Sequence, residues 1–236
     1  MKILRMFVGY DEREAIGYHA FTQSVIEHAT RPVSITALKG EQRDGTNAFT
    51  YARFLVPYLC NFEGIACFAD GSDMLALDDI QGLFDLSRPS FAVQVVKHTY
   101  KTRHPRKYIG TEMESENHDY PRKNWSSLIL FDCGAEENRC LTPEYIASKS
   151  GSFLHRFAWL QDHNIGELPP EWNVLIDEMG SVPNALPYVK IAHFTLGIPG
   201  IEHYSKSSMA SLWKATSERA NRKPAQIGGA KCLQNT

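Results

Sequence analysis

The sequence lacks a long hydrophobic run, a CxxC pair and a strong net charge. No run approaches the roughly 18 apolar residues that a membrane-spanning helix needs. The apolar run at residues 3–8 is also too short for the hydrophobic region of a secretory signal. We therefore expect no integral membrane segment and a cytoplasmic location.

Acidic and basic residues are nearly balanced, since the formal net charge is −2 over 236 residues. This balance excludes a general electrostatic attraction to nucleic acid, so we expect no nucleic-acid partner. The five cysteines are odd in number and lack metal-site spacing, which indicates reduced thiols. Hydrophobic residues make up 43% of the chain and charged residues 22%, as is typical of a globular domain.

Short apolar segments alternate with stretches of helical periodicity along the chain. The expected strands cover residues 3–8, 33–38, 64–69, 91–96, 127–131 and 188–194, and the expected helices cover 15–25, 49–59, 153–160 and 207–220. This alternation predicts one α/β domain over residues 1–222, with a mostly parallel central sheet flanked by helices. Residues 223–236 contain Pro, Gly and polar residues without a period, which predicts a mobile tail.

The segment CFADGSDM at residues 67–74 carries two carboxylates directly after an apolar strand. Asp70 and Asp73 are hard oxygen ligands of the kind that Mg²⁺ and Mn²⁺ prefer. Gly71 permits a tight turn that would direct both toward one ion. An equally balanced alternative is a polar turn in which Asp73 or Asp79 caps a helix.

A histidine ends the last expected strand, in the segment KIAHFTLGIPG. Neutral imidazole is able to complete a coordination shell that two carboxylates begin, and loop amides near Gly197 and Gly200 are able to donate to phosphate. The alternative is that His193 is an ordinary hydrogen-bonded structural residue, which is the commoner role of a single histidine.

Four segments in this order resemble family-8 glycosyltransferases, the retaining GT-A group that includes glycogenin and bacterial galactosyltransferases. They are NAFTYARFLVPYL, CFADGSDMLALDDIQGLF, LPPEWNVL and AHFTLGIPG. The resemblance spans residues 2–213. It implies a GT-A fold and transfer of a hexose from a nucleotide-diphospho sugar, with UDP-glucose or UDP-galactose as the expected donor and Mn²⁺ or Mg²⁺ as cofactor. The acceptor is not indicated.

The resemblance also implies a role for individual positions. The metal ligands would be Asp70, Asp73 and His193. Donor-binding residues would be Tyr10, Asp11, Arg53, Asp70, Asn124, Ser126, Ser127 and Gly197. Gln161 and Asp162 partly match a family segment near the anomeric carbon and would be catalytic. Helix capping remains an alternative for Asp11 and Asp162, a surface charge for Arg53, and turn chemistry for residues 124–127.

Two departures from the family pattern matter. The family spaces its acidic pair by one intervening residue, whereas DGSD has two. The late loop also lacks the family's lysine, so Lys206 or a basic segment at residues 97–107 is the expected substitute. We interpret that segment mainly as a solvated loop, with a lid or acceptor platform as the alternative.

Two other classes of protein compete with a transferase. A non-catalytic nucleotide-sugar binder would keep the fold and the ligand site. A metal-dependent sugar nucleotidyltransferase or phosphatase would use an acidic pair for phosphoryl chemistry. A nucleotidyltransferase would need a Gly-rich basic loop after its first strand, which GYDEREAIGYH does not resemble. An aspartyl phosphatase needs its nucleophile on the first strand, and Asp70 lies too late in the chain.

Overall fold

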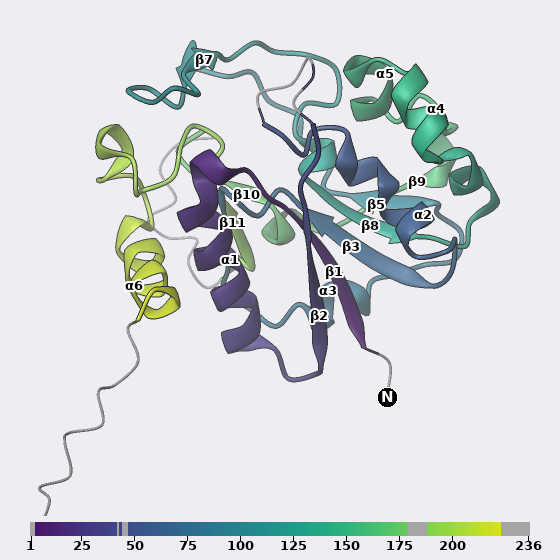
Figure 1. The fold of residues 1–236 in the computed structure, drawn as a ribbon, viewed down its shortest axis with the longest axis horizontal. Helices are drawn as coiled ribbons and strands as arrows, with labels where there is room; N and C mark the ends of the chain where they lie inside the picture. Colours follow the sequence, from purple (N-terminus) through teal and green to yellow (C-terminus); the bar gives the residue numbers. More distant parts are fainter. Residues whose placement is uncertain (1–2, 42, 44–46, 179–187, 223–236) are drawn as a thin grey trace, which may run out of the picture.

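The computed structural model describes residues 3–41, 43, 47–178 and 188–222 (Figure 1). The predicted tail at residues 223–236 lies outside the described residues. The strands are β1 (Leu4–Gly9), β2 (Val33–Leu38), β3 (Ile65–Ala69), β4 (Met74–Ala76), β5 (Val93–Val95), β6 (Arg106–Lys107), β7 (Ser115–Glu116), β8 (Leu128–Asp132), β9 (Ile165–Glu167), β10 (Val174–Leu175) and β11 (Ile191–His193). The α-helices are α1 (Ala15–His28), α2 (Val56–Leu59), α3 (Gln81–Phe84), α4 (Pro143–Ser148), α5 (Gly151–His155) and α6 (Ala210–Ala220).

The central sheet has the strand order β2-β1-β3-β8-β5-β9. Strand β1 is parallel to β2 and β3, and β5 is parallel to β9, whereas β8 is antiparallel to both of its neighbours. Five strands therefore run in one direction and β8 runs against them. The predicted α/β domain with a mostly parallel sheet is confirmed.

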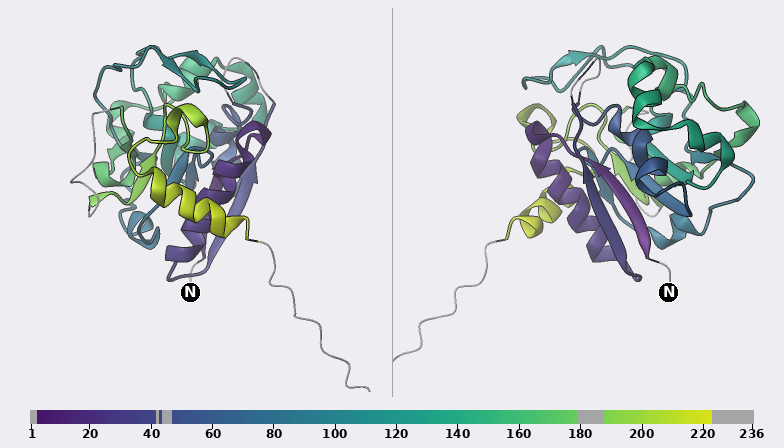
Figure 2. Two further views of the ribbon diagram at one scale, coloured as in Figure 1. Left: turned by 90° about the vertical axis from the view of Figure 1, so that its left-hand side faces the viewer. Right: turned by 45° about the vertical axis from the view of Figure 1, so that its right-hand side comes forward.

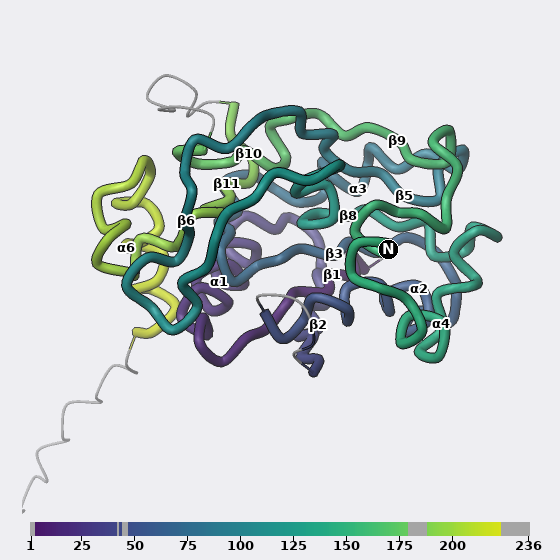
Figure 3. The backbone as a smooth tube through the Cα atoms, turned by 90° about the horizontal axis from the view of Figure 1, so that it is seen from above, coloured from purple at the N-terminus to yellow at the C-terminus, as the bar shows by residue number. Residues whose placement is uncertain are grey.

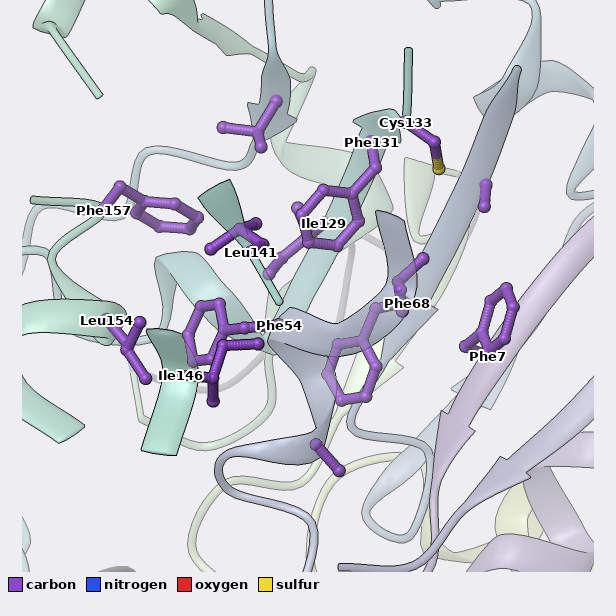
Figure 4. Packing of buried hydrophobic residues seen from close by; sticks show 14 of the residues in the cluster. Phe7, Phe54, Phe68, Ile129, Phe131, Cys133, Leu141, Ile146, Leu154 and Phe157 are labelled. Carbon is purple, nitrogen blue, oxygen red and sulfur yellow. The ribbon is translucent and has the colours of Figure 1, made fainter. Parts of the chain in front are cut away.

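Both faces of this sheet are buried, because successive side chains of each strand point to opposite faces. Phe7, Phe68 and Phe131 point into one apolar cluster, which α2, α4 and α5 cover (Figure 4). Met6, Val8 and Leu130 are examples of residues that point into a second cluster on the other face. Continuous apolar strands of this kind are typical of sheets with helices on both sides.

A second, three-stranded sheet has the order β10-β11-β4 and packs beside the first. Its residues Leu75 and Ala192 share an apolar cluster with Ala20 of α1 and Trp213 of α6. Helices α1 and α6 lie side by side in both views (Figure 2). The last helix, α6, therefore packs against both the small sheet and α1. Among the described residues, no helix is both long and apolar enough to span a bilayer.

Two helix predictions need correction. The helix expected over residues 153–160 ends at His155, because Phe157 has a positive φ of 53° and its ring turns into the core. The stripe at residues 49–59 folds as a short 3-10 helix, Ala52–Leu55, followed by α2. In both places the apolar spacing predicted correctly which side chains are buried, but the continuous helix that it also predicted is absent from these described segments.

Candidate active site

A tight turn after β3 positions the two predicted carboxylates. Gly71 has a φ of 67°, and a Cβ built there would lie 2.2 Å from Val8 Cγ1, so glycine is required at this position. The amide of Asp70 donates to the Ser127 carbonyl over 2.8 Å, which ties the turn to the start of β8. Asp70 thus stands at the end of β3, and Asp73 stands immediately before β4.

Strand pairing brings the histidine to the same place. β11 is antiparallel to β4, with His193 opposite Met74, and the Phe194 amide donates to the Asp73 carbonyl over 2.7 Å. One ligand atom from each of Asp70, Asp73 and His193 lies within 4.8 Å of the others. Spacing by two residues therefore still brings both carboxylates and the imidazole together, because the turn separates two strands of different sheets.

Hydrogen bonds orient the imidazole of His193. Ser127 Oγ donates to the Asn124 carbonyl over 2.7 Å, so this hydroxyl accepts from Asn173 Nδ2 at 2.9 Å. The amide oxygen Asn173 Oδ1 then faces His193 Nδ1 at 2.9 Å and accepts a hydrogen bond from the Nδ1–H group. A proton on Nδ1 leaves Nε2 as the lone-pair nitrogen of the neutral ring, which is the form that binds a metal.

The arrangement of lone pairs fits a cation. His193 Nε2 lies 3.3 Å from Asp73 Oδ2, and two lone pairs at this distance need a shared proton or a metal ion between them. Asp73 Oδ1 is also buried without a hydrogen-bond partner among the described residues. Two carboxylates and one imidazole form a donor set that suits Mn²⁺ or Mg²⁺.

The two carboxyl groups have different electrostatic environments. Burial raises the pKa of Asp70 to about 6, against the opposing effect of Arg53, whose Nη1 lies 2.6 Å from Asp70 Oδ1 without hydrogen-bond alignment. Burial also acts to raise the pKa of Asp73, but His193, Lys107 and the Tyr108 hydroxyl outweigh it and lower this pKa. Asp73 is therefore the carboxylate that stays ionised most readily and would hold a cation most firmly.

These groups line a cavity of about 680 Å³ at the carboxyl end of β3. Seven of the predicted site residues line it: Arg53, Asp70, Asp73, Asn124, Ser126, Ser127 and His193. A cavity of this volume is within the usual range for small-molecule sites. The structure brings the predicted metal ligands and the predicted donor-binding residues of the 124–127 turn into one place.

Five predicted site residues, all within the described part of the chain, do not line this cavity: Tyr10, Asp11, Gly197, Gln161 and Asp162. Asp11 caps the 3-10 helix η1 (Glu12–Glu14) by accepting from the Arg13 amide, and Tyr10 packs edge-on against Tyr18.

The remaining three stand in unrelated surroundings. Gly197 has a φ of 148° and lies under the Tyr204 ring, which a Cβ would meet at 2.3 Å. Gln161 is exposed, and Asp162 is exposed and pairs with Arg122 at 2.5 Å. Neither Gln161 nor Asp162 lines the cavity. The catalytic role of these two residues stays a prediction.

The basic middle segment covers the cavity more closely than a solvated loop would. Seen from above, residues 97–123 run across the end of the sheet where β1 and β3 finish (Figure 3). The Tyr108 amide donates to the Leu196 carbonyl over 2.7 Å, and its hydroxyl donates to Asp73 Oδ2 over 3.3 Å. Lys107 and Tyr108 line the cavity, so for these residues the structure favours the lid or platform interpretation.

Sequence reasoning missed several residues of the site. Asn173 belongs to the Trp-Asn motif that carried the family resemblance, and the motif alone assigned it no role. His155, whose Nδ1 lies 2.6 Å from Ser126 Oγ, gave no signal in the sequence. No motif in the sequence assigned a role to Glu14, yet this residue is 3% exposed, and neither carboxyl oxygen has a partner among the described residues.

Glu14→Gln is expected to change the pH dependence of stability. Burial, followed by the charges of Asp73 and Asp11, raises the pKa of Glu14 well above 4.5. The folded wild type therefore keeps a proton that the unfolded chain releases above pH 4.5, and its stability falls as pH rises, by at most about 1.4 kcal/mol per pH unit from this group. Glutamine removes this loss. Urea unfolding in chelator at pH 4.5, 5.5 and 6.5 should show a gap that widens with pH.

Glu12→Gln is the matched control for this experiment, because Glu12 lies in the same 3-10 helix with its side chain exposed. The control should show no widening gap. A constant difference between Glu14→Gln and wild type across the three pH values would contradict the perturbed titration.

Asn173→Ala is expected to weaken metal binding by roughly 10- to 100-fold, as is usual for loss of a residue that orients a metal ligand. Alanine removes the acceptor for His193 Nδ1 and the donor to Ser127. Calorimetric titration of Mn²⁺ measures the change, with Asn221→Ala at the end of α6 as control. Unchanged Mn²⁺ affinity in Asn173→Ala would show that Asn173 does not orient a metal-binding imidazole.

The fold is that of GT-A glycosyltransferases. The bifunctional glycosyltransferase WbbM superposes with a TM-score of 0.57 at 16% identity, over 94% of this chain and 50% of that chain. GlyE of Streptococcus pneumoniae TIGR4 superposes with a TM-score of 0.64 at 14% identity, over 92% and 60%. The galactosyltransferase LgtC, solved with donor and acceptor sugar analogs, superposes at 0.60 with 10% identity, over 94% and 98%. The chain thus spans half to three-fifths of the length of WbbM and GlyE.

No protein-family model matches the sequence. Protein CDI of Arabidopsis thaliana is 36% identical over 237 residues, covering 94% of this chain and 88% of that protein. The chain belongs to the same family as Protein CDI.

Proposed function

We propose that this chain is a divalent-metal-dependent glycosyltransferase that moves a hexose from a nucleotide-diphospho sugar to an acceptor. The observation that carries this proposal is the convergence of Asp70, Asp73 and His193 within 4.8 Å, in a cavity at the strand ends of a GT-A fold. Ligands of open α/β sheets bind beyond the carboxyl ends of the strands, which is where these residues stand. The segments that resemble family-8 glycosyltransferases support the same activity, and the resemblance implies UDP-glucose or UDP-galactose as donor and retention of configuration.

Asp70, Asp73 and His193 would hold Mn²⁺ or Mg²⁺, and the cation would neutralise the negative charge that develops on the departing diphosphate. The chain itself supplies orientation and charge. Asn173 fixes the His193 ring, and Arg53 holds Asp70. Lys107 is the lysine of the basic segment that lines the cavity, and its charge acts on Asp73 and Asp70. It is therefore the residue that would contact phosphate in place of a lysine in the late loop.

The donor experiment is calorimetric titration with UDP in the presence and absence of Mn²⁺, followed by measurement of sugar release from UDP-glucose and UDP-galactose. We expect UDP to bind only with the cation, and one donor to be turned over. Binding of UDP without any turnover in the presence of candidate acceptors would instead favour a non-catalytic binder. Release of phosphate rather than UDP would favour phosphoryl chemistry.

A further inference from the structure

A second, smaller cavity of about 210 Å³ adjoins the first. Five residues line both cavities: Lys107, Glu116, Tyr120, Asn124 and Thr195. Groups bound in the two cavities would therefore lie against a common wall. This closeness is what a transfer reaction needs between its two substrates, because the reacting atoms must approach to about 3–3.5 Å.

The second cavity is built from a different part of the chain than the nucleotide side of the first. Its walls come from residues 100–124, between β5 and β8, together with Glu178 after β10 and Thr195 after β11. Asn47 and Thr50, which follow β2, line only the first cavity among the described residues. A second substrate would thus contact the segment between β5 and β8 and the residues that follow β10 and β11.

Buried polar groups without partners mark the second cavity as a ligand site. Glu178 is 2% exposed, its Oε1 lies 3.9 Å from Lys123 Nζ, and its Oε2 has no hydrogen-bond partner among the described residues. Thr195 Oγ1 is likewise buried without a partner among them. Buried polar atoms are nearly always hydrogen-bonded in folded proteins, so these two atoms call for a polar ligand.

The charge balance indicates which ligand fits. Lys107 and Lys123 face Glu116 and Glu178, so the lining has no net charge when His118 is neutral. Lys123 Nζ lies 3.6 Å from Asp119 Oδ1 and 3.9 Å from Glu178 Oε1, which leaves little unneutralised positive charge for an anion. A hydroxyl both donates and accepts, so a hydroxyl-bearing ligand is able to donate to Glu178 Oε2 and accept from Thr195 Oγ1.

Two aromatic rings complete the lining. Tyr100 is fixed by the Asn124 amide, which donates to its hydroxyl over 2.8 Å, and Tyr120 is 44% exposed. Aromatic faces offer apolar contact to the carbon face of a sugar ring, while their hydroxyls remain available to polar groups. The combination of tyrosines, a carboxylate and no net charge is suited to a neutral sugar or polyol.

We infer that the second cavity is the acceptor subsite and takes a neutral, hydroxyl-rich group, with Glu178 as the residue that receives its hydroxyl hydrogen bond. This inference rests on the proposed transferase function. In the transfer, the acceptor oxygen bonds to the anomeric carbon, and the bond from that carbon to the diphosphate breaks with its electron pair on the diphosphate. The proton of the attacking hydroxyl passes to an oxygen of the departing diphosphate.

Saturation-transfer NMR on the full chain, with UDP and Mg²⁺, tests the inference. The probes are methyl glucoside, methyl galactoside, glycerol and myo-inositol, with methyl glucuronide as the anionic comparison. We expect saturation transfer to at least one neutral probe, and about a tenfold weaker affinity for it in Glu178→Gln, which loses a hydrogen bond to a charged acceptor. Glu144→Gln, on the exposed side of α4, is the control and should match wild type.

The outcomes separate this inference from the donor assignment. UDP binding with no transfer to any neutral probe, stronger transfer to the glucuronide, or equal affinity in Glu178→Gln would each overturn the acceptor subsite. Failure of UDP itself to bind would overturn the donor site instead. Should Glu178→Gln fail to fold, Tyr120→Ala removes an exposed ring of the same cavity, and unchanged probe affinity in that variant would also overturn the inference.

Discussion

Asp73→Asn is expected to abolish metal-dependent donor turnover, lowering it by roughly a thousandfold or more. A catalytic metal supplies several kcal/mol of charge stabilisation, and each 1.36 kcal/mol corresponds to a tenfold change in rate. Asp73 is the carboxylate whose pKa is lowered in this site, and it contacts both His193 and Tyr108. Its loss removes the ligand that stays ionised most readily.

The fold should survive this substitution. Asparagine is close in size to aspartate, and it removes a buried carboxylate oxygen that has no partner among the described residues. Melting temperatures measured in chelator should therefore be equal to wild type or higher. The control is Asp78→Asn, at an exposed position shortly after β4 that pairs with Lys190 at 3.5 Å. Turnover by Asp73→Asn that still stops on addition of chelator would remove Asp73 from the metal site.

The sequence predicted the framework of this site because its signals are local. Apolar segments that end in Asp70 and His193 identified two strands, and Gly71 identified the turn, since each depends on residues adjacent in the chain. These two strands belong to different sheets, and they end close enough together to bring the three predicted ligands within 4.8 Å of one another. The metal-ligand set could therefore be proposed before any contact was known.

The second layer of the site could not be predicted in this way. Asn173, Glu14 and Glu178 become important only through burial, which depends on packing between segments far apart in the sequence. Gln161 differs from these residues: a short motif match suggested a role at the reacting centre, that role stays a prediction, and the side chain is exposed in the structure. Motif spacing reports neighbours along the chain, whereas exposure is decided by tertiary structure.

The second large effect is expected on stability and donor affinity, from substitution of Arg53. Arg53 is 4% exposed, and its guanidinium lies 2.6 Å from Asp70 Oδ1 and donates to the carbonyls of Ser126 at 2.8 Å and Thr50 at 3.1 Å. Its Cζ also lies 5.0 Å from the centre of the Phe68 ring. Arg53 therefore connects the helix before β3, the turn after β3 that carries Asp70, and the start of β8. The alternative of a surface charge is wrong for this residue.

Arg53→Met is expected to lower the free energy of unfolding by about 3–5 kcal/mol at neutral pH, since removal of one partner leaves the other charge buried and uncompensated. Donor affinity should fall as well, because Asp70 loses the group that holds it beside Asp73. Arg53→Lys keeps the charge but lacks the planar fork that reaches a carboxylate and two carbonyls, so it should recover only part of the stability. Urea unfolding in chelator measures both variants.

A double-mutant cycle with Asp70→Asn isolates the ion pair from the other contacts of Arg53. Once Asp70 is neutral, Arg53→Met no longer leaves a buried charge without a partner. The loss of unfolding free energy caused by Arg53→Met should then be smaller by roughly 1–3 kcal/mol, within the usual coupling between residues in direct contact. The cost that remains belongs to the two carbonyls and the packing on Phe68. Additive effects of the two substitutions would show that the pair contributes nothing to folding, and Arg53 would then matter only for ligand binding.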